Sequence, residues 1–363
     1  SASVALPDRA KDMIKPERLR AGDRVAAISL SWGGAGVLPW RYEAGKKQLK
    51  EEFGLEIVET AHSLEKPAFL AEHPELRAKD LMDALRDPDI KGIISNIGGE
   101  DSIRMLPYLD FDVIRANPKV FVGFSDATVT HLAFFKAGVV SFYGPSLLAG
   151  FAENCGMFRY LADSFRAVAF DAKPVGLVEP NRDGWTNEFL DWFVPENATK
   201  DRRDRLQTSC LGWNWLQGGS AVVSGPLFGG CMEVLEFAKA TDLWPDNWRG
   251  KILFFETSED HPTPQDVKWW LRNYAAQGIF TQVAAVLFGR PGHGRLPVDP
   301  ATFGDYDEAF LQVIAREEKL TDLPIVTGMD IGHTEPFMTL PIGVTAQLDC
   351  QAKTFSITEG AVL

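Results

Sequence analysis

The stretch VFVGFSDATVTH, residues 120–131, runs from an apolar strand pattern through a glycine-containing turn directly into a segment that can form a helix. In a parallel α/β sheet such a turn lies at the carboxyl edge, where sites gather. Ser125 occupies the turn, and G-F-S-D-A differs by one residue from the G-x-S-x-G elbow of hydrolases, because Ala127 replaces the second glycine. Serine is also a common helix N-cap. This stretch alone leaves Ser125 open as a nucleophile or a cap.

The segments before this turn alternate between short β-branched runs and helical patterns. We expect strands at 24–31, 55–60 and 90–99, and helices at 41–54 and 74–87. Alternation of this kind predicts a parallel sheet with helices on both faces. The glycine pair Gly98-Gly99 would end one strand at the same edge as the turn that carries Ser125.

The second half of the chain repeats this alternation and ends in strand patterns at 339–349 and 354–360, which predicts a second α/β unit. We therefore expect two domains, as the length of 363 residues also suggests. The predicted segments are a poorly ordered leader at 1–14, an N-terminal domain at 15–170, a linker and substrate loop at 171–217, and a C-terminal domain at 218–363.

The stretch 181–217 is polar and irregular, yet it holds four of the ten tryptophans of the chain. These are Trp185, Trp192, Trp213 and Trp215. Long ordered loops in compact proteins are often lids or binding loops. We interpret this one as a wall of the substrate site, with a domain-packing surface as the alternative.

The composition of the chain limits the classes of partner that we expect it to bind. The net charge is −13 and no long basic run is present, which argues against nucleic acid or anionic lipid as a partner. The four cysteines form no C-x-x-C pair, so free buried thiols are expected rather than a zinc or redox motif. No apolar run approaches a membrane span, and the first residues lack a signal-peptide core. We expect a cytoplasmic protein that acts on small molecules or peptides.

A serine nucleophile needs a base and an orienting acid. The chain has six histidines, at positions 62, 73, 131, 261, 293 and 333. His131 would point away from the turn, because six residues of helix rise about 9 Å, so we expect it to serve in packing. His293 and His333 both follow strand patterns, and His333 has the stronger context. Glu256 ends the apolar strand KILFFE, where it is a candidate acid or a solvated strand end.

Six blocks together resemble the LD-carboxypeptidase family of serine peptidases, whose relatives include the microcin C self-immunity peptidases. In chain order they are GDRVAAISLS, NIGGEDSIRMLPYLD, GFSDAT, GPLFGGCMEVL, ILFFETSE and GHTEPFMTLPIG. The resemblance extends from about residue 15 to about residue 359.

The resemblance implies a catalytic triad in which Ser125 is the nucleophile, Glu256 the acid and His333 the base. It also implies an oxyanion hole made by the backbone N–H groups of Gly99 and Asp126. The implied architecture is an N-terminal amidotransferase-like α/β domain with a parallel sheet and a smaller C-terminal α/β domain with barrel-like strands. Family members are usually homodimers, and neither a metal nor an organic cofactor is expected.

The resemblance leaves two substrates open, because the family has two branches with different activities. One branch removes the terminal D-alanine of murein tetrapeptide, and the immunity branch cleaves the amide of peptidyl or aminoacyl nucleotides. The tryptophan-bearing loop resembles the immunity branch, in which a loop tryptophan stacks on adenine. We expect Trp192 in that role, with Trp185 as second choice. Where many members have G-G-N, this chain has Gly229-Gly230-Cys231, so no role of that asparagine is transferred.

A third hypothesis is a non-catalytic nucleotide-binding module that uses the Gly98-Gly99 strand end. It lacks support from the known nucleotide motifs, because neither G-x-G-x-x-G nor a P-loop is present.

Overall fold

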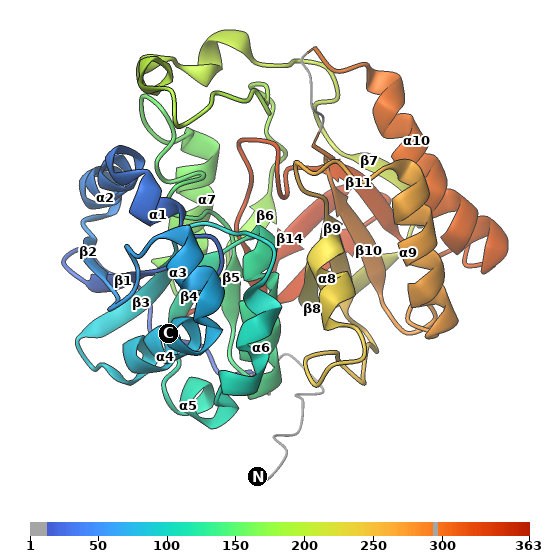
Figure 1. Cartoon of the computed structure of the whole chain (residues 1–363). Helices are drawn as coiled ribbons and strands as arrows, with labels where there is room; N and C mark the ends of the chain where they lie inside the picture. Colours follow the sequence, from blue (N-terminus) through green and yellow to red (C-terminus); the bar gives the residue numbers. More distant parts are fainter. Residues whose placement is uncertain (1–12, 293–296) are drawn as a thin grey trace.

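A computed structural model describes residues 13–292 and 297–363 and contains two sheets that lie side by side (Figure 1). The first sheet has the strand order β12-β5-β4-β3-β1-β2. Its strands are β1 (Arg24–Ile28), β2 (Glu56–Glu59), β3 (Ile90–Ser95), β4 (Val120–Gly123), β5 (Ser141–Tyr143) and β12 (Leu340–Ile342). Strands β1 to β5 are parallel, and β12 pairs antiparallel with β5. The predicted parallel sheet is therefore confirmed.

Helices of the first half connect these strands. They are α1 (Gly34–Val37), α2 (Pro39–Phe53), α3 (Pro67–Glu72), α4 (Pro74–Arg86), α5 (Phe111–Ala116), α6 (Thr128–Ala137) and α7 (Arg159–Ala169), with the 3-10 turns η2 (Ser102–Tyr108) and η3 (Ser125–Ala127). Helix α2 ends where Gly54 adopts the left-handed conformation, as its C-cap position favours. Nearly every residue of α6 is buried, because α6 contacts α5 and β5 of the first half and also α8 (Met232–Ala238) and β8 (Val222–Cys231) of the second half.

The second sheet has the order β6-β14-β13-β8-β9-β10-β11-β7. Its strands are β6 (Gly176–Val178), β7 (Asn214–Gln217), β8 (Val222–Cys231), β9 (Ile252–Glu256), β10 (Ala285–Gly289), β11 (Ile325–Met329), β13 (Thr345–Asp349) and β14 (Thr354–Ile357). Strands β8 to β11 are parallel, and the outer pairings are antiparallel. The helical segments here are α8 (Met232–Ala238), α9 (Pro264–Ala276), α10 (Pro300–Phe310) and the π-helix η6 (Leu311–Glu317).

The two sheets are not divided strictly by sequence. Strand β12 follows β11 in the chain but pairs with β5, so the segment 330–339 passes from the second sheet to the first. The expected linker and loop at 171–217 contributes β6 and β7 to the second sheet, and between them it forms the short turns η4 (Pro195–Thr199) and η5 (Arg202–Arg205). One hydrophobic core extends under both sheets. The chain is thus α/β in both halves, as predicted.

Across residues 13–292 and 297–363, no helix is both long enough and apolar enough to cross a membrane.

Candidate active site

Ser125 lies in a strained turn directly after β4. Its φ of +62° is in the left-handed region, which a non-glycine residue occupies at a cost of about 1–3 kcal/mol. The turn is tightly packed, because a Cβ atom on Gly123 would lie 2.8 Å from the Cβ of Ser95. The N-cap positions of η3 and α6 are Phe124 and Ala127, and neither helix has a side-chain cap. The structure therefore does not support the interpretation of Ser125 as a helix cap.

Tyr143 connects this turn to the second sheet. The backbone N–H of Ser125 donates to the Tyr143 hydroxyl at 3.0 Å, and that hydroxyl donates to Oε1 of Glu256 at 2.5 Å. Burial, followed by the nearby Glu256 carboxylate, raises the pKa of Tyr143 well above its usual value. The phenol therefore stays protonated and remains available as a donor.

Glu256, the last residue of β9, holds His333. Its side chain is fully buried, and its Oε2 lies 2.6 Å from Nδ1 of His333. The close approach requires a glycine before the histidine, since a Cβ on Gly332 would lie 2.3 Å from Oε2 of Glu256. The His333 ring also packs on Phe124, with 5.0 Å between ring centres. The imidazole thus lies against the residue that precedes Ser125.

The electrostatics around His333 favour its charged form. Burial disfavours the imidazolium, but nearby carboxylates outweigh burial and raise the pKa of His333 to about 9. These carboxylates belong to Glu256, Glu259 and Glu233. Glu259 makes a direct contact, with its Oε2 3.2 Å from Nε2 of His333. Both ring nitrogens therefore face carboxylates.

Thr128, on the first turn of α6, joins the two halves beside this centre. Its hydroxyl donates to the Ser125 carbonyl at 2.7 Å and accepts from the backbone N–H of Cys231 at 3.0 Å. A Cβ on Gly230 would lie 2.5 Å from the Thr128 methyl, so a glycine is required there. The end of β8 is in this way fixed against the turn that carries Ser125.

The glycine pair after β3 borders the same space. A Cβ on Gly98 would lie 3.2 Å from Oγ of Ser125 and 3.2 Å from the backbone nitrogen of Asp126. The Asp126 carboxylate has a structural partner, since it is buried and accepts a hydrogen bond from the backbone N–H of Ser102 at 2.9 Å. The assignment of the backbone N–H groups of Gly99 and Asp126 to an oxyanion hole stays a prediction.

Comparison with known proteins identifies the family. Residues 25–144 match the model of the LD-carboxypeptidase N-terminal domain, and residues 224–348 match that of the LD-carboxypeptidase C-terminal domain. The chain belongs to the LD-carboxypeptidase family. The first match ends one residue after Tyr143, and the second includes both Glu256 and His333.

Several relatives of this LD-carboxypeptidase family member cover much of its length. The microcin C7 self-immunity protein MccF of Escherichia coli is 28% identical over 78% of each chain. A Bacillus subtilis protein named "probable murein peptide carboxypeptidase" is 26% identical over 95% of each. Among solved structures, an MccF-like protein from Streptococcus pneumoniae in complex with AMP has a TM-score of 0.82 and 33% identity, over 93% of this chain and 99% of that one.

His131, one of the histidines that the sequence made available, has its partners elsewhere in this family member. His131 is buried, and its ring nitrogens lie 2.7 Å from Oγ of Ser141 and 2.7 Å from the carbonyl of Gly123. Burial lowers the pKa of His131 to about 4, so it is a neutral structural residue. His293 lies outside the described residues.

Trp192 lies at the edge where the strands of the first sheet end. The guanidinium of Arg41 lies 4.4 Å above its ring, and Arg41 donates to the carbonyl of Leu148 at 2.9 Å. The backbone N–H of Leu148 in turn donates to Asn96, the residue after β3. Trp192 is only partly buried, so it retains accessible ring surface.

The structure does not favour Trp185 for stacking on a base, the role for which the sequence gave it as second choice. Its side chain is fully buried. The guanidinium carbon of Arg290 lies 5.1 Å from the centre of the indole ring, and the ring centre of Phe303 lies 5.8 Å from it. Its indole N–H donates to the carbonyl of Ser209 at 2.8 Å. The ring is enclosed by protein and has no free face for a base. This burial favours a packing role for Trp185 in the loop, and Trp192 stays the predicted stacking residue.

The loop that carries both tryptophans is fastened to the segment that carries His333. The backbones of Thr186 and Glu335 exchange two hydrogen bonds of 2.8 Å, two residues after His333. Arg202 of the loop pairs with Glu335 at 2.8 Å and with Glu153. The position of the loop is thus coupled to the segment that carries the histidine.

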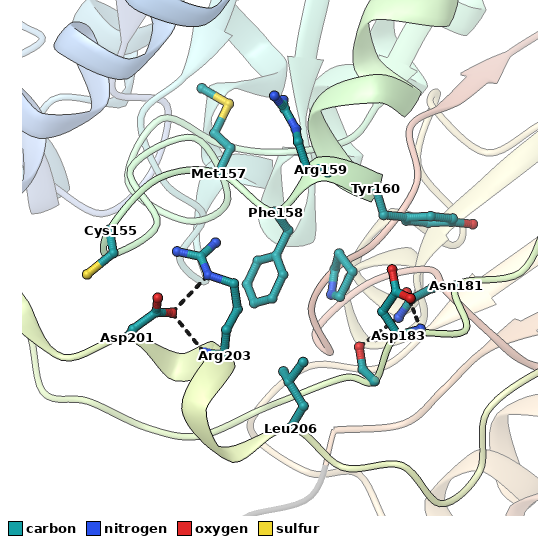
Figure 2. A pocket seen from close by; sticks show the side chains of 12 residues that line it. Cys155, Met157, Phe158, Arg159, Tyr160, Asn181, Asp183, Asp201, Arg203 and Leu206 are labelled. Atoms are coloured by element: carbon teal, nitrogen blue, oxygen red, sulfur yellow. Dashed lines mark hydrogen bonds and ion pairs between the residues drawn. The ribbon is translucent and has the colours of Figure 1, made fainter.

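A separate cavity of about 430 Å³ lies beneath this loop (Figure 2). Its lining includes Phe158, Tyr160 and Arg203, and Arg203 is occupied by an ion pair with Asp201. No residue of the predicted triad lines it among the described residues. This cavity is therefore distinct from the centre built around Ser125.

Sequence reasoning missed three groups at the site: Tyr143, Thr128 and the pair of carboxylates on Glu233 and Glu259. Tyr143 ends an apolar run and Thr128 follows the serine turn, so the sequence indicated that each lies near a strand end but did not indicate its partner. Glu259 lies in the block ILFFETSE, three residues after Glu256, and was the easiest of these residues to identify from the sequence.

Proposed function

We propose that this chain is a serine hydrolase that cleaves amide bonds with Ser125, His333 and Glu256 as its triad. The observation that carries the proposal is the position of a strained serine turn against a histidine that a buried glutamate holds by its Nδ1 atom. A left-handed serine after a strand and before a helix is the geometry of a nucleophile elbow.

In the proposed reaction, Oγ of Ser125 attacks the substrate carbonyl while Nε2 of His333 accepts the hydroxyl proton. Glu256 keeps Nδ1 protonated and stabilises the imidazolium that forms. The C–N bond then breaks, and the leaving nitrogen takes the proton from His333. Water then attacks the acyl-serine carbonyl while His333 takes a proton from the water. The ester bond breaks as His333 returns a proton to Oγ of Ser125, and the acid is released.

The substrate that we propose is a peptidyl or aminoacyl nucleotide. Trp192 supports it, because a partly exposed indole at the strand-end edge can stack on a base for about 1–3 kcal/mol. The relatives support it further, since one is named for microcin self-immunity and a solved MccF-like structure contains AMP.

Murein tetrapeptide is the second candidate, with release of its terminal D-alanine. A relative that covers 95% of this chain carries the name of a murein peptide carboxypeptidase, which favours it. With this substrate Trp192 would serve in packing rather than in binding.

The test measures hydrolysis of alanyl- and aspartyl-sulfamoyl-adenosine and of murein tetrapeptide by the wild type, Ser125→Ala and the exposed-serine control Ser220→Ala. We expect cleavage of an aminoacyl nucleotide by the wild type and the control, and its loss in Ser125→Ala. Equal activity of all three proteins would refute the triad. Cleavage of murein peptide alone would replace the substrate and keep the triad. Nucleotide binding without any labelling of Ser125 by a serine-directed phosphonate would favour the non-catalytic module.

A further inference from the structure

The catalytic histidine of the proposed triad is held between two carboxylates of different character. Glu256, on Nδ1, is fully buried at the end of β9. Glu259, on Nε2, has 78% of its side chain exposed and lies in the turn that follows the same strand. The first carboxylate is a fixed part of the fold, whereas the second can move into solvent at little cost.

A third carboxylate faces the same ring from another element. Glu233, on the first turn of α8, accepts the backbone N–H of Ser258 at 3.1 Å. Burial first, and then the charge of Glu256, raise the pKa of Glu233. The turn with Glu259 is thereby fastened to α8, and three carboxylates surround a single imidazole.

The contact at Nε2 conflicts with the proposed reaction. An imidazolium that is hydrogen-bonded to Glu256 at Nδ1 and ion-paired with Glu259 at Nε2 has no lone pair with which to accept the proton of Ser125. Glu259 must leave Nε2 before His333 can act as a base. A cationic group on the substrate would provide the alternative partner for Glu259 and offset the surrounding negative charge.

We propose that Glu259 is a specificity-determining residue, which binds an ammonium group on the acyl part of the substrate and thereby releases Nε2 of His333. The inference rests on the proposed function and adds a substrate class to it: acyl groups that carry a free ammonium, on the α-carbon or on a basic side chain. Acyl groups with a carboxylate side chain would meet Glu259 as a like charge and react more slowly.

The experiment compares sulfamoyl-adenosines that differ only in the acyl group: alanyl, N-acetyl-alanyl, lysyl and aspartyl. Wild type is measured beside Glu259→Gln and the neighbouring exposed control Asp260→Asn. We expect wild type to cleave the alanyl compound about tenfold faster, in kcat/KM, than its N-acetyl form, and to prefer lysyl over aspartyl. In Glu259→Gln both preferences should fall toward unity, whereas Asp260→Asn should keep them.

A second readout separates recognition from a general loss of activity. Glu259→Gln removes a carboxylate from Nε2, so the pKa of His333, followed by NMR, should fall below that of the wild type and stay unchanged in Asp260→Asn. Binding of the alanyl and N-acetyl-alanyl pair to Ser125→Ala is measured in parallel, and tighter binding of the free amine is expected.

The outcomes distinguish the two proposals. Hydrolysis that depends on Ser125 but shows no preference for the free amine would overturn the role of Glu259 and leave the triad intact. A preference for the free amine that persists in Glu259→Gln would likewise overturn the role of Glu259 and leave the triad intact. Absence of hydrolysis of every compound would refute the proposed aminoacyl-nucleotide substrate, and equal affinity of Ser125→Ala for the paired compounds would then refute the role of Glu259 as well.

Discussion

Replacement of Tyr143 by phenylalanine removes one oxygen atom that serves two parts of the site. The hydroxyl donates to the buried Glu256 carboxylate and accepts the backbone N–H of Ser125. A hydrogen bond to a charged group contributes about 1.5–3 kcal/mol, and a neutral hydrogen bond such as that from the partly buried Ser125 N–H contributes about 0.5–1.5 kcal/mol. The lower ends of these ranges add to about 2 kcal/mol, which is the destabilisation that we expect as a minimum.

The measurement is urea unfolding followed by tryptophan fluorescence, with Tyr160→Phe as the matched control. The Tyr160 hydroxyl donates to the carbonyl of Glu179 in an exposed position, so its loss should cost no more than about 1 kcal/mol. We also expect kcat to fall by about ten- to a hundredfold in Tyr143→Phe, because both the nucleophile turn and the acid lose a fixed contact.

A double-mutant cycle tests the reason for the effect. In a Glu256→Gln background the carboxylate is absent, so Tyr143→Phe should cost clearly less than it does in the wild type. If Tyr143→Phe destabilises the protein no more than Tyr160→Phe, or if its cost is the same in both backgrounds, the hydroxyl does not couple the turn to the acid and the reasoning is wrong.

Three further predictions concern the same site. For the free enzyme, kcat/KM should rise with pH up to about 9, since His333 must lose its proton to act as a base and carboxylates raise its pKa to that value; a pH profile that is flat from 6 to 9 would contradict it. Gly98→Ala should lower kcat by about a hundredfold with little change in unfolding free energy, because its Cβ would lie 3.2 Å from Oγ of Ser125, in the space of the predicted oxyanion; unchanged kinetics would place the oxyanion elsewhere. Trp192→Ala should weaken AMP binding by about ten- to a hundredfold in calorimetry, whereas Trp185→Ala should chiefly lower the unfolding free energy; the reverse pattern would restore the tryptophan in the core of the loop as the stacking residue.

The sequence could predict those parts of the site that follow a strand directly. Ser125 and Glu256 follow or end apolar runs, and the ends of parallel strands meet at one edge, so local pattern predicted their place in the sheets. Their roles in a triad came from the resemblance and stay a prediction. Tyr143 is different, because β5 is three residues long and lies inside an apolar stretch that has no period of two. Nothing local indicates that its hydroxyl reaches a glutamate of the other sheet.

The two loop tryptophans show a second limit. Trp185 and Trp192 have similar polar neighbours in sequence, and both are plausible stacking residues on that basis. Their difference is set by partners distant in the chain: Arg290 and Phe303 enclose the first, and Arg41 supports the second. Burial of this kind depends on tertiary packing, which the pattern of a single irregular segment does not contain.

Strand β12 gives the molecule a property that concerns its expression and engineering. Its residues 340–342 complete the edge of the first sheet by pairing with β5, the strand that carries Tyr143. A fragment that ends after the first half would leave β5 with unpaired backbone groups, which invite aggregation by edge-to-edge pairing. During synthesis the first sheet is therefore completed only after residues 340–342 have been made. Split forms of the protein, or exchanges of halves between relatives, should keep residues 330–342 with the first half rather than cut the chain at the middle.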